Sequence, residues 1–285
     1  MSKNLIARIA VAAVAIPIIL WICYEGGAWL FGMLLLFAAI GAIEFFLGEG
    51  SKPTGGLFWI GLLTVAVNFA VISGACLGRF CPAETIRGAF GSLGMVVPSL
   101  FFFTFTAMIL AVGKEPPSEL FKRHSRIVWG VLYLSLLYPM VYRVGHGYAD
   151  ISGGNWLLFL FGLLWVGDTA AMWTGMAIGK HKLAPAVSPN KTIEGFIGGI
   201  AGALAVTVLM YFWKFNSFSF GHLLAIGAGC SVCGQLGDLV ESMWKRSLGI
   251  KDSSALIPGH GGVLDRFDSL LFAAPFMYFY LRLLA

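Results

Sequence analysis

The sequence predicts an all-α fold, a polytopic integral membrane protein with about nine transmembrane helices. Of the 285 residues, 58% are apolar and only 12% are charged, whereas a water-soluble domain carries about twice that charged fraction. The mean hydropathy is +0.84. Apolar runs of about 20 residues recur along the chain, and this length crosses a hydrocarbon core of about 30 Å. Intrinsic disorder is excluded, because 24 Phe and 9 Trp are incompatible with the low hydrophobicity that disorder requires.

Polar or Gly/Pro-rich breaks separate the predicted spans. The spans cover residues 5–24, 27–47, 56–77, 89–112, 127–144, 156–178, 193–213, 220–240 and 265–284. The loop 113–126 contains Pro116-Pro117 and is a natural internal boundary. We therefore divide the chain into an N-terminal transmembrane region, 1–145, with about five spans, and a C-terminal region, 146–285. Acidic residues enter the apolar spans only in the second region, apart from Glu44, so we expect function there.

The distribution of Lys and Arg predicts the orientation of these spans. With the N-terminus inside, 14 of the 19 Lys and Arg residues fall on the inner side, as the positive-inside rule demands. The N-terminus is then cytoplasmic and the C-terminus external. The loops 179–192 and 241–264 are both cytoplasmic in this arrangement.

The net positive charge of the chain is also explained by its membrane topology. A net charge of +5 would suggest a nucleic-acid partner in a soluble protein, but here the cations are topology determinants, so we expect no nucleic acid. The five cysteines show no metal-binding spacing in a polar context. We interpret Cys230 and Cys233 as a buried structural pair. Cys76 and Cys81 could form a disulfide if their turn faces an oxidising compartment.

Acidic residues inside or at the edge of apolar spans are the first functional candidates. Asp168 lies deep in an apolar stretch, Asp238 closes the eighth predicted span, and Asp265 and Asp268 open the ninth. A carboxylate in hydrocarbon is costly unless it meets a cation, water or a polar cavity. Pairing with a Lys or Ser of a neighbouring helix would explain any single one, but four on one membrane face favour function. Glu44 is a fifth buried acid for which a structural role is equally plausible.

The spacing of these acids points to a metal. Asp265 and Asp268 are three residues apart, so on a helix they share a face. Two anions so close need a cation beside them. Mg²⁺ fits, because it is held by one or two carboxylates, several waters and substrate phosphates. Asp238 and Glu241 have the same spacing and can converge with the first pair if the eighth and ninth helices are antiparallel neighbours.

The segment between the two acidic pairs carries the groups that bind phosphate. Lys245, Arg246, Lys251 and Arg266 supply four cations. The glycines near its end leave backbone N–H groups accessible to an anion; they are Gly259, Gly261 and Gly262. A phosphoryl or nucleotidyl transfer site needs acids that hold a metal, together with cations and glycines that bind phosphate, and all of these are present here. The cations alone would be equally consistent with a solvated cytoplasmic loop.

The segment from Ser242 to Asp268 resembles the signature of the phosphatidate cytidylyltransferases, also called CDP-diglyceride synthases. The family pattern runs from Ser through Lys-Arg, Lys-Asp and a Pro-x-His-Gly-Gly turn to Asp-Arg-x-Asp, and it is met over 27 consecutive residues. Trp244 stands where the family usually has an aliphatic residue or Phe, and we expect only a packing change there.

A second, less specific block is similar to the same family. It begins at Asp168 and includes Gly175, Gly179-Lys180 and the run from Ser188 to Gly195. Small residues recur along one face of the seventh predicted helix, at Gly195, Gly198, Gly199 and Gly202. Such a stripe predicts close packing against a neighbouring helix.

The resemblance implies the reaction of CTP with phosphatidate to give CDP-diacylglycerol and pyrophosphate, at the cytoplasmic face of a bacterial inner membrane. It also implies a homodimer, membrane lipids as partners and Mg²⁺ as cofactor; whether a monovalent cation such as K⁺ joins the Mg²⁺ stays open. The expected metal ligands are Asp238, Asp265 and Asp268, which are also expected to be catalytic together with His260 and Lys251. The expected substrate-binding residues are Asp168, Ser188, Lys191, Lys245, Arg246, Gly261, Gly262 and Arg266. His260 either donates to a phosphate or caps its turn.

Two alternatives belong to other classes. A cation- or proton-coupled transporter would also place acids such as Asp168 within spans, but it would not need a long Lys/Arg/Gly/His loop that ends in paired Asp. A CDP-alcohol phosphotransferase would share the substrate class and the metal. That family, however, carries Asp-Gly-x-x-Ala-Arg and Asp-x-x-x-Asp patterns, whereas this chain has Asp265-x-x-Asp268.

Overall fold

The computed structural model describes residues 3–50, 56–74, 98–106, 109, 116–148, 150–257 and 261–284. Its helices are α1 (Lys3–Glu25), α2 (Gly27–Gly48), α3 (Gly56–Ser73), α5 (Pro117–Val144), α6 (Gly153–Ile178), α7 (Ile193–Trp213), α8 (Phe220–Ser247) and α9 (Leu264–Leu283). Residues 98–106 are also helical. The predicted all-α class is confirmed. Cys76, Cys81, His260 and most of the predicted span 89–112 lie outside the described residues.

Five of the described helices are long and apolar enough to cross a membrane. They are Gly27–Gly48, His124–Val144, Gly153–Ile178, Ile193–Trp213 and Phe220–Ser247. Two shorter apolar helices, Ala13–Glu25 and Phe58–Ser73, accompany them. Helix α9 is not among the five, and charged residues stand at both of its ends. The chain is a multi-pass membrane protein, while the count of about nine spans stays a prediction.

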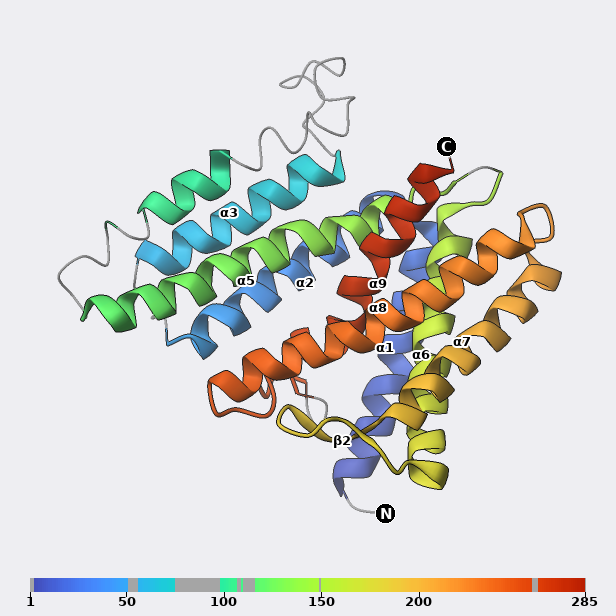
Figure 1. The fold of residues 1–285 in the computed structure, drawn as a ribbon. Helices are drawn as coiled ribbons and strands as arrows, with labels where there is room; N and C mark the ends of the chain where they lie inside the picture. Colours follow the sequence, from blue (N-terminus) through green and yellow to red (C-terminus); the bar gives the residue numbers. More distant parts are fainter. Residues whose placement is uncertain are drawn as a thin grey trace.

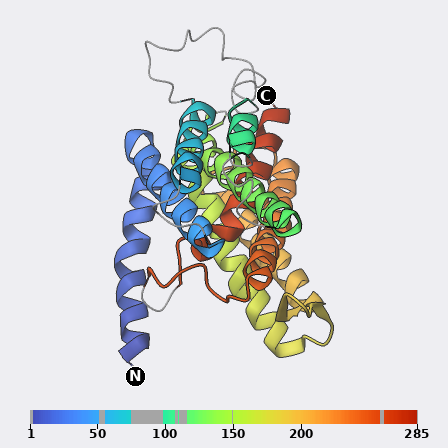
Figure 2. The same cartoon turned by 90° about the vertical axis from the view of Figure 1, so that its left-hand side faces the viewer.

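Two groups of helices make up the molecule. Helices α6, α7, α8 and α9 pack against one another, and α2, α3 and α5 form a second group. The two groups meet where α5 contacts α9 and α6, and α1 contacts both α6 and α2. In Figure 1 the N-terminus, the hairpin that contains β2 and the end of α8 lie at the lower end, and the C-terminus lies at the upper end. Figure 2 shows the same separation after a quarter turn. This is the same-side arrangement that the Lys and Arg distribution predicts.

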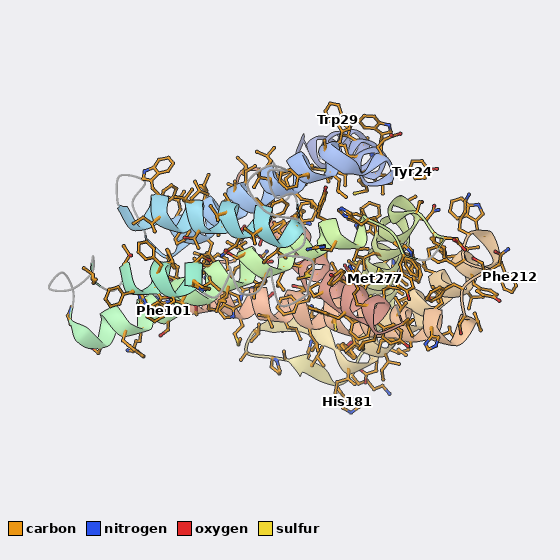
Figure 3. All side chains as sticks on the ribbon, turned by 90° about the horizontal axis from the view of Figure 1, so that it is seen from above. Tyr24, Trp29, Phe101, His181, Phe212 and Met277 are labelled. Atoms are coloured by element: carbon orange, nitrogen blue, oxygen red, sulfur yellow. The ribbon has the colours of Figure 1, made fainter. Side chains whose placement is uncertain are left out.

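The surface of the helices is largely apolar, as lipid contact requires. Figure 3 shows Trp29 and Phe212 at the periphery and Met277 among the helices. The exposed fractions are 65% for Trp29 and 74% for Phe212, whereas Met277 is fully buried. Because large apolar side chains face outward on several helices, the surroundings of these helices are hydrocarbon.

The predicted glycine stripe of α7 is confirmed as a packing surface. A Cβ at Gly202 would lie 2.6 Å from Cβ of Ala170 in α6, and a Cβ at Gly198 would overlap the side chain of Thr174. At Gly195 the carbonyl oxygen of Ala171 would be 2.8 Å away. The absence of side chains therefore lets α6 and α7 approach backbone to backbone.

Several predicted boundaries were wrong. Helix α5 begins at Pro117, ten residues before the predicted start at 127, because Pro suits the first position of a helix. Helix α8 continues to Ser247, so 241–247 are helical and not loop. Lys245 and Arg246 lie in its last turn, where cations stabilise the helix dipole.

The predicted loop 179–192 contains a small antiparallel hairpin. Strands β1 (Lys182–Ala184) and β2 (Ser188–Thr192) pair with Lys182 opposite Thr192. Thr192 then caps α7, because its Oγ1 accepts a hydrogen bond of 3.0 Å from the N–H of Gly195. Glu194 fixes the entry to the hairpin by accepting hydrogen bonds from the backbone N–H groups of Lys180 and His181.

Candidate active site

The two predicted acidic pairs meet because α8 and α9 are antiparallel neighbours. Sγ of Cys230 lies 3.7 Å from the carbonyl oxygen of Ala273, and a Cβ at Gly237 would lie 2.9 Å from the carbonyl oxygen of Asp268. The contact therefore moves toward the start of α9 as α8 proceeds toward its end. This geometry brings the last turns of α8 beside the first turn of α9, at the end of the molecule that carries the hairpin (Figure 1).

Lys245 and Asp265 form a buried ion pair at this junction. Nζ of Lys245 lies 2.6 Å from Oδ1 of Asp265 and 3.2 Å from Oε1 of Glu241. Lys245 is 7% exposed and Asp265 is 8% exposed. Lys245 was predicted to bind substrate, but the structure places its ammonium group between two carboxylates.

The second oxygen of Asp265 is fully engaged by the connection between α8 and α9, residues 248–263, which we call the signature loop. Oδ2 accepts hydrogen bonds from the backbone N–H of Ser253 (2.9 Å), its hydroxyl (3.0 Å) and the N–H of Gly262 (2.8 Å). The amide of Gly262, which the sequence assigned to an anion, thus donates to Asp265. Gly261 occupies the left-handed region with φ +83°, which glycine adopts without strain.

Glu241, which the sequence pairs with Asp238 but leaves out of the expected ligands and binding residues, also belongs to this site. Its side chain is fully buried, and neither of its oxygens makes a hydrogen bond within the described part of the chain. The 3.2 Å approach of Lys245 is an ion-pair contact outside hydrogen-bond geometry. The signal was present in the sequence, because Glu241 stands three residues after Asp238 and four before Lys245.

A second ion pair, between Lys191 and Asp238, joins β2 to α8. Nζ of Lys191 lies 2.5 Å from Oδ2 of Asp238, and the two side chains are 28% and 34% exposed. The hydroxyl of Ser242 donates to the other oxygen of Asp238 at 3.3 Å. Asp168 of α6 is exposed and lies within electrostatic reach of both Lys191 and Asp238. The structure therefore brings the two sequence blocks together at one place.

The remaining predicted cations lie on the outer side of the same region. Arg246 connects the hairpin to the signature loop, since its Nε donates to the carbonyl of Val187 and its Nη1 to the carbonyl of Ile250. Lys251 and Arg266 are exposed. Ser188 is half-buried in β2, opposite Ala184.

The acids of the cluster outnumber its cations. Among the described residues, two lysines pair with three of the five carboxylates in this region, Lys191 with Asp238 and Lys245 with Glu241 and Asp265; the other two are Asp168 and Asp268. Carboxylates this close to one another need a further cation or a bound proton. The cluster therefore suits a metal ion or a substrate that brings one.

A metal ion at this cluster would have few protein ligands. Among the described residues, no three His, Cys, Asp or Glu side chains converge as a metal site. Both oxygens of Asp265 are engaged, whereas in the described part of the chain only Oδ1 of Asp268 accepts a hydrogen bond, from the N–H of Ser269 at 2.6 Å. Mg²⁺ commonly takes one or two carboxylates and completes its shell with water and phosphate oxygens, so these residues fit Mg²⁺. Asp265 could join only after releasing present hydrogen bonds.

Glu44 of α2 and Glu49, the residue that follows this helix, were not predicted at this site. Glu44 accepts hydrogen bonds from the signature loop and the first turn of α9. Glu49 accepts from Nε of Arg126 at 2.9 Å and from Nε1 of Trp244 at 3.1 Å. The indole of Trp244 also stacks on the ring of Phe45, with the ring centroids 4.8 Å apart, so Trp244 contributes a hydrogen bond as well as packing.

Comparison with known proteins places this arrangement in a family. A sequence model described as the cytidylyltransferase family matches residues 6–284. The phosphatidate cytidylyltransferase of Staphylococcus haemolyticus is 49% identical over 131 residues, which are 46% of this chain and 50% of the relative. The Staphylococcus aureus protein of the same name is 50% identical over 127 residues, 44% of this chain and 48% of the relative. The chain thus spans about half the length of the curated relatives it matches. The family match covers nearly all of the sequence, and the chain belongs to the cytidylyltransferase family.

Proposed function

We propose that this protein transfers the cytidylyl group of CTP to phosphatidate, giving CDP-diacylglycerol and pyrophosphate for phospholipid synthesis. The observation that carries the proposal is the convergence of Lys191 with Asp238, and of Lys245 with Asp265, at one end of apolar helices. The family match and the names of the Staphylococcus relatives support it. Cations beside acids at the edge of a membrane suit a reaction that joins a nucleotide to a lipid phosphate.

The residues act mainly by positioning and charge. The phosphate of phosphatidate is already ionised at neutral pH, so it can attack the α-phosphorus of CTP in line without a strong general base. The difficulty is to bring two polyanions together, and Lys191, Arg246, Lys251 and Arg266 neutralise their charge. Such placement supplies most of the rate in phosphoryl transfer. Mg²⁺ bound at Asp238 and Asp268, and at Asp265 after it releases its present bonds, would neutralise the phosphate oxygens.

The position of the site within the bilayer is part of the proposal. We place the N-terminus, the hairpin and the signature loop in the cytoplasm of a bacterial cell and the C-terminus outside, because CTP is a cytoplasmic substrate. The protein then resides in the inner membrane, and phosphatidate reaches Asp168 and Lys191 from the cytoplasmic leaflet. We also propose that it forms a homodimer, which light scattering of the protein in detergent micelles would test.

The direct test of the function is a transfer assay. Purified protein with phosphatidate, Mg²⁺ and CTP labelled in the cytosine base should produce a lipid-soluble labelled product and release pyrophosphate. Omission of phosphatidate is the control. If CTP gives no labelled lipid, but CDP-diacylglycerol and an alcohol give a phosphatidyl alcohol with release of CMP, the protein is a CDP-alcohol phosphotransferase. Cation flux in liposomes with no lipid product would make it a transporter.

Substitution of Lys251 by Ala should raise the KM for CTP without affecting folding. The loss of a charged contact to the triphosphate costs about 1 to 3 kcal/mol, roughly a 5- to 150-fold change in KM. Lys251 is exposed, so we expect the thermal unfolding temperature to stay unchanged. Lys214→Ala, which removes an exposed cation at the opposite end of the molecule, is the matched control. An unchanged KM in Lys251→Ala would return Lys251 to a purely topological role.

Cysteine labelling tests the sidedness. In a Cys-free background, single cysteines at the exposed positions Ala186, Ala255 and Asn216 should divide into two classes. Positions 186 and 255 should react only with a reagent that reaches the cytoplasm, and position 216 with one confined to the outside. Labelling of position 255 from outside would invert the topology and place the site out of reach of CTP.

A further inference from the structure

The carboxylate of Glu44 is held at the centre of a contact between α2 and the signature loop. It is 4% exposed. Oε1 accepts hydrogen bonds from the hydroxyl of Ser254 (2.7 Å) and the N–H of Val263 (2.9 Å). Oε2 accepts from the hydroxyl of Ser253 (3.0 Å) and the N–H of Leu264 (3.0 Å). These donors follow Glu44 by more than 200 positions in the sequence.

Two of the four donors belong to the start of α9. The first N–H groups of a helix have no acceptor within the helix. The N-cap residue of α9, Val263, has no side-chain acceptor to offer them. Glu44 takes this role from another helix, and a carboxylate is favourable there because it faces the positive end of the helix dipole. Asp265 is the next residue after Leu264, so the contact also fixes the backbone that carries Asp265.

Ser253 connects Glu44 to Asp265 directly. Its Oγ lies 3.0 Å from Oε2 of Glu44 and 3.0 Å from Oδ2 of Asp265. A hydroxyl has one proton, so it can donate to only one of the two carboxylates at a time. Glu44 keeps three other donors when Ser253 turns to Asp265, and Asp265 keeps Lys245 and two backbone N–H groups when Ser253 turns to Glu44. The hydroxyl can therefore change partners without leaving either acid unpaired.

We propose that Glu44 is a positioning residue for the Asp265–Lys245 pair, acting through the start of α9 and through the shared hydroxyl of Ser253. The effect of Glu44 on catalysis rests on the proposed function. The hydrogen bonds that connect Glu44 to Asp265 do not depend on that function. Glu44 supplies the second acceptor that lets Ser253 release Oδ2 of Asp265 when that oxygen takes another partner. The N-terminal region thereby contributes to the site without touching substrate.

Two neighbouring serines offer a matched test. Ser253→Ala and Ser254→Ala each remove one hydroxyl from Glu44, but only Ser253 also reaches Asp265. We expect Ser253→Ala to lower kcat by about 10-fold or more, the effect of a lost hydrogen bond to a charged group, with the KM for CTP within about 2-fold of wild type. Ser254→Ala should change kcat by less than about 2-fold. Equal losses in both variants would overturn the proposal.

A measurement without catalysis separates this inference from the proposed function. Thermal unfolding in detergent micelles is compared for Glu44→Gln, Asp265→Asn and the double variant. The three variants are made in two backgrounds, one with Ser253 and one with Ser253→Ala. With Ser253 present, the two shifts in unfolding temperature should be clearly non-additive, because the two residues share a partner. In the Ser253→Ala background the non-additivity should become smaller, leaving only the part that the start of α9 transmits. Additive shifts in both backgrounds would refute the coupling, whereas a coupled protein that makes no CDP-diacylglycerol would refute only the proposed function.

Discussion

Asp265→Asn should abolish most turnover, by about 100-fold or more, the usual range for the loss of one preorganised electrostatic group. The substitution removes the negative charge that faces Nζ of Lys245 at 2.6 Å. It also presents either an amide oxygen or an NH₂ group to the N–H donors of Ser253 and Gly262, and the NH₂ group cannot accept them. Loss of one partner of a buried ion pair costs about 3 to 5 kcal/mol, so the unfolding temperature should fall as well.

The measurement is the initial rate against CTP and Mg²⁺ concentration, together with thermal unfolding in the same micelles. Asp150→Asn is the matched control, because Asp150 is an exposed acid in the turn between α5 and α6, at the end away from the site (Figure 1). A rate near wild type for Asp265→Asn, with an unchanged Mg²⁺ dependence, would remove Asp265 from the site and with it the assignment of the signature loop.

Gly262→Ala is the second change from which we expect a large effect. A Cβ at Gly262 would lie 2.5 Å from Oε2 of Glu44 and 2.6 Å from its Oε1, and it would overlap the hydroxyl of Ser253. Overpacking of a buried site costs about 1 to 3 kcal/mol, and here the atoms that must move are the hydrogen-bond partners of Asp265. Activity should fall by about 10-fold or more even where the variant inserts normally into the membrane.

Gly221→Ala provides the comparison for this variant. Gly221 lies in the first turn of α8, and a Cβ there would meet no atom within 4 Å. Alanine is a better helix former than glycine, so this change should leave activity intact and the unfolding temperature equal or slightly higher. Both variants are compared by kcat and by thermal unfolding. Wild-type behaviour of Gly262→Ala would show that the loop relaxes freely, contrary to the tight contact with Glu44.

The fold was predictable where the hydrophobic pattern is strong. The apolar runs located α2, α6, α7, α8 and α9 to within a few residues at most of their ends. The errors fell where charge was taken as a sign of loop. Arg126 lies within α5 and Lys245 within α8, because each is paired with a glutamate and so does not interrupt its helix. The hairpin was missed because its longer strand, Ser188–Thr192, is polar and contains Pro189.

The parts of the candidate site that depend on the spacing of residues within one segment were predictable from the sequence. The three-residue intervals within the pairs Asp238/Glu241 and Asp265/Asp268 allowed the two pairs to converge if α8 and α9 were antiparallel neighbours, and in the structure they are. Contacts between segments that are distant in the sequence could not be predicted from residue spacing. Nothing near Glu44 in the sequence indicates that Ser253 would lie 3.0 Å from it, and the burial of Lys245 could not be told from its place among other basic residues.

The two lysine–aspartate pairs of the site differ in how they respond to ionic strength. Lys191 and Asp238 are about one-third exposed, so dissolved salt screens their attraction and an exposed pair of this kind contributes little stability. Lys245 and Asp265 are shielded from counterions by the surrounding protein. In the proposed reaction, Lys191 would therefore exchange Asp238 for the phosphate of a substrate at small cost, whereas Lys245 would remain with its carboxylates. The exposed pair would then respond to salt and to substrate, and the buried pair to neither.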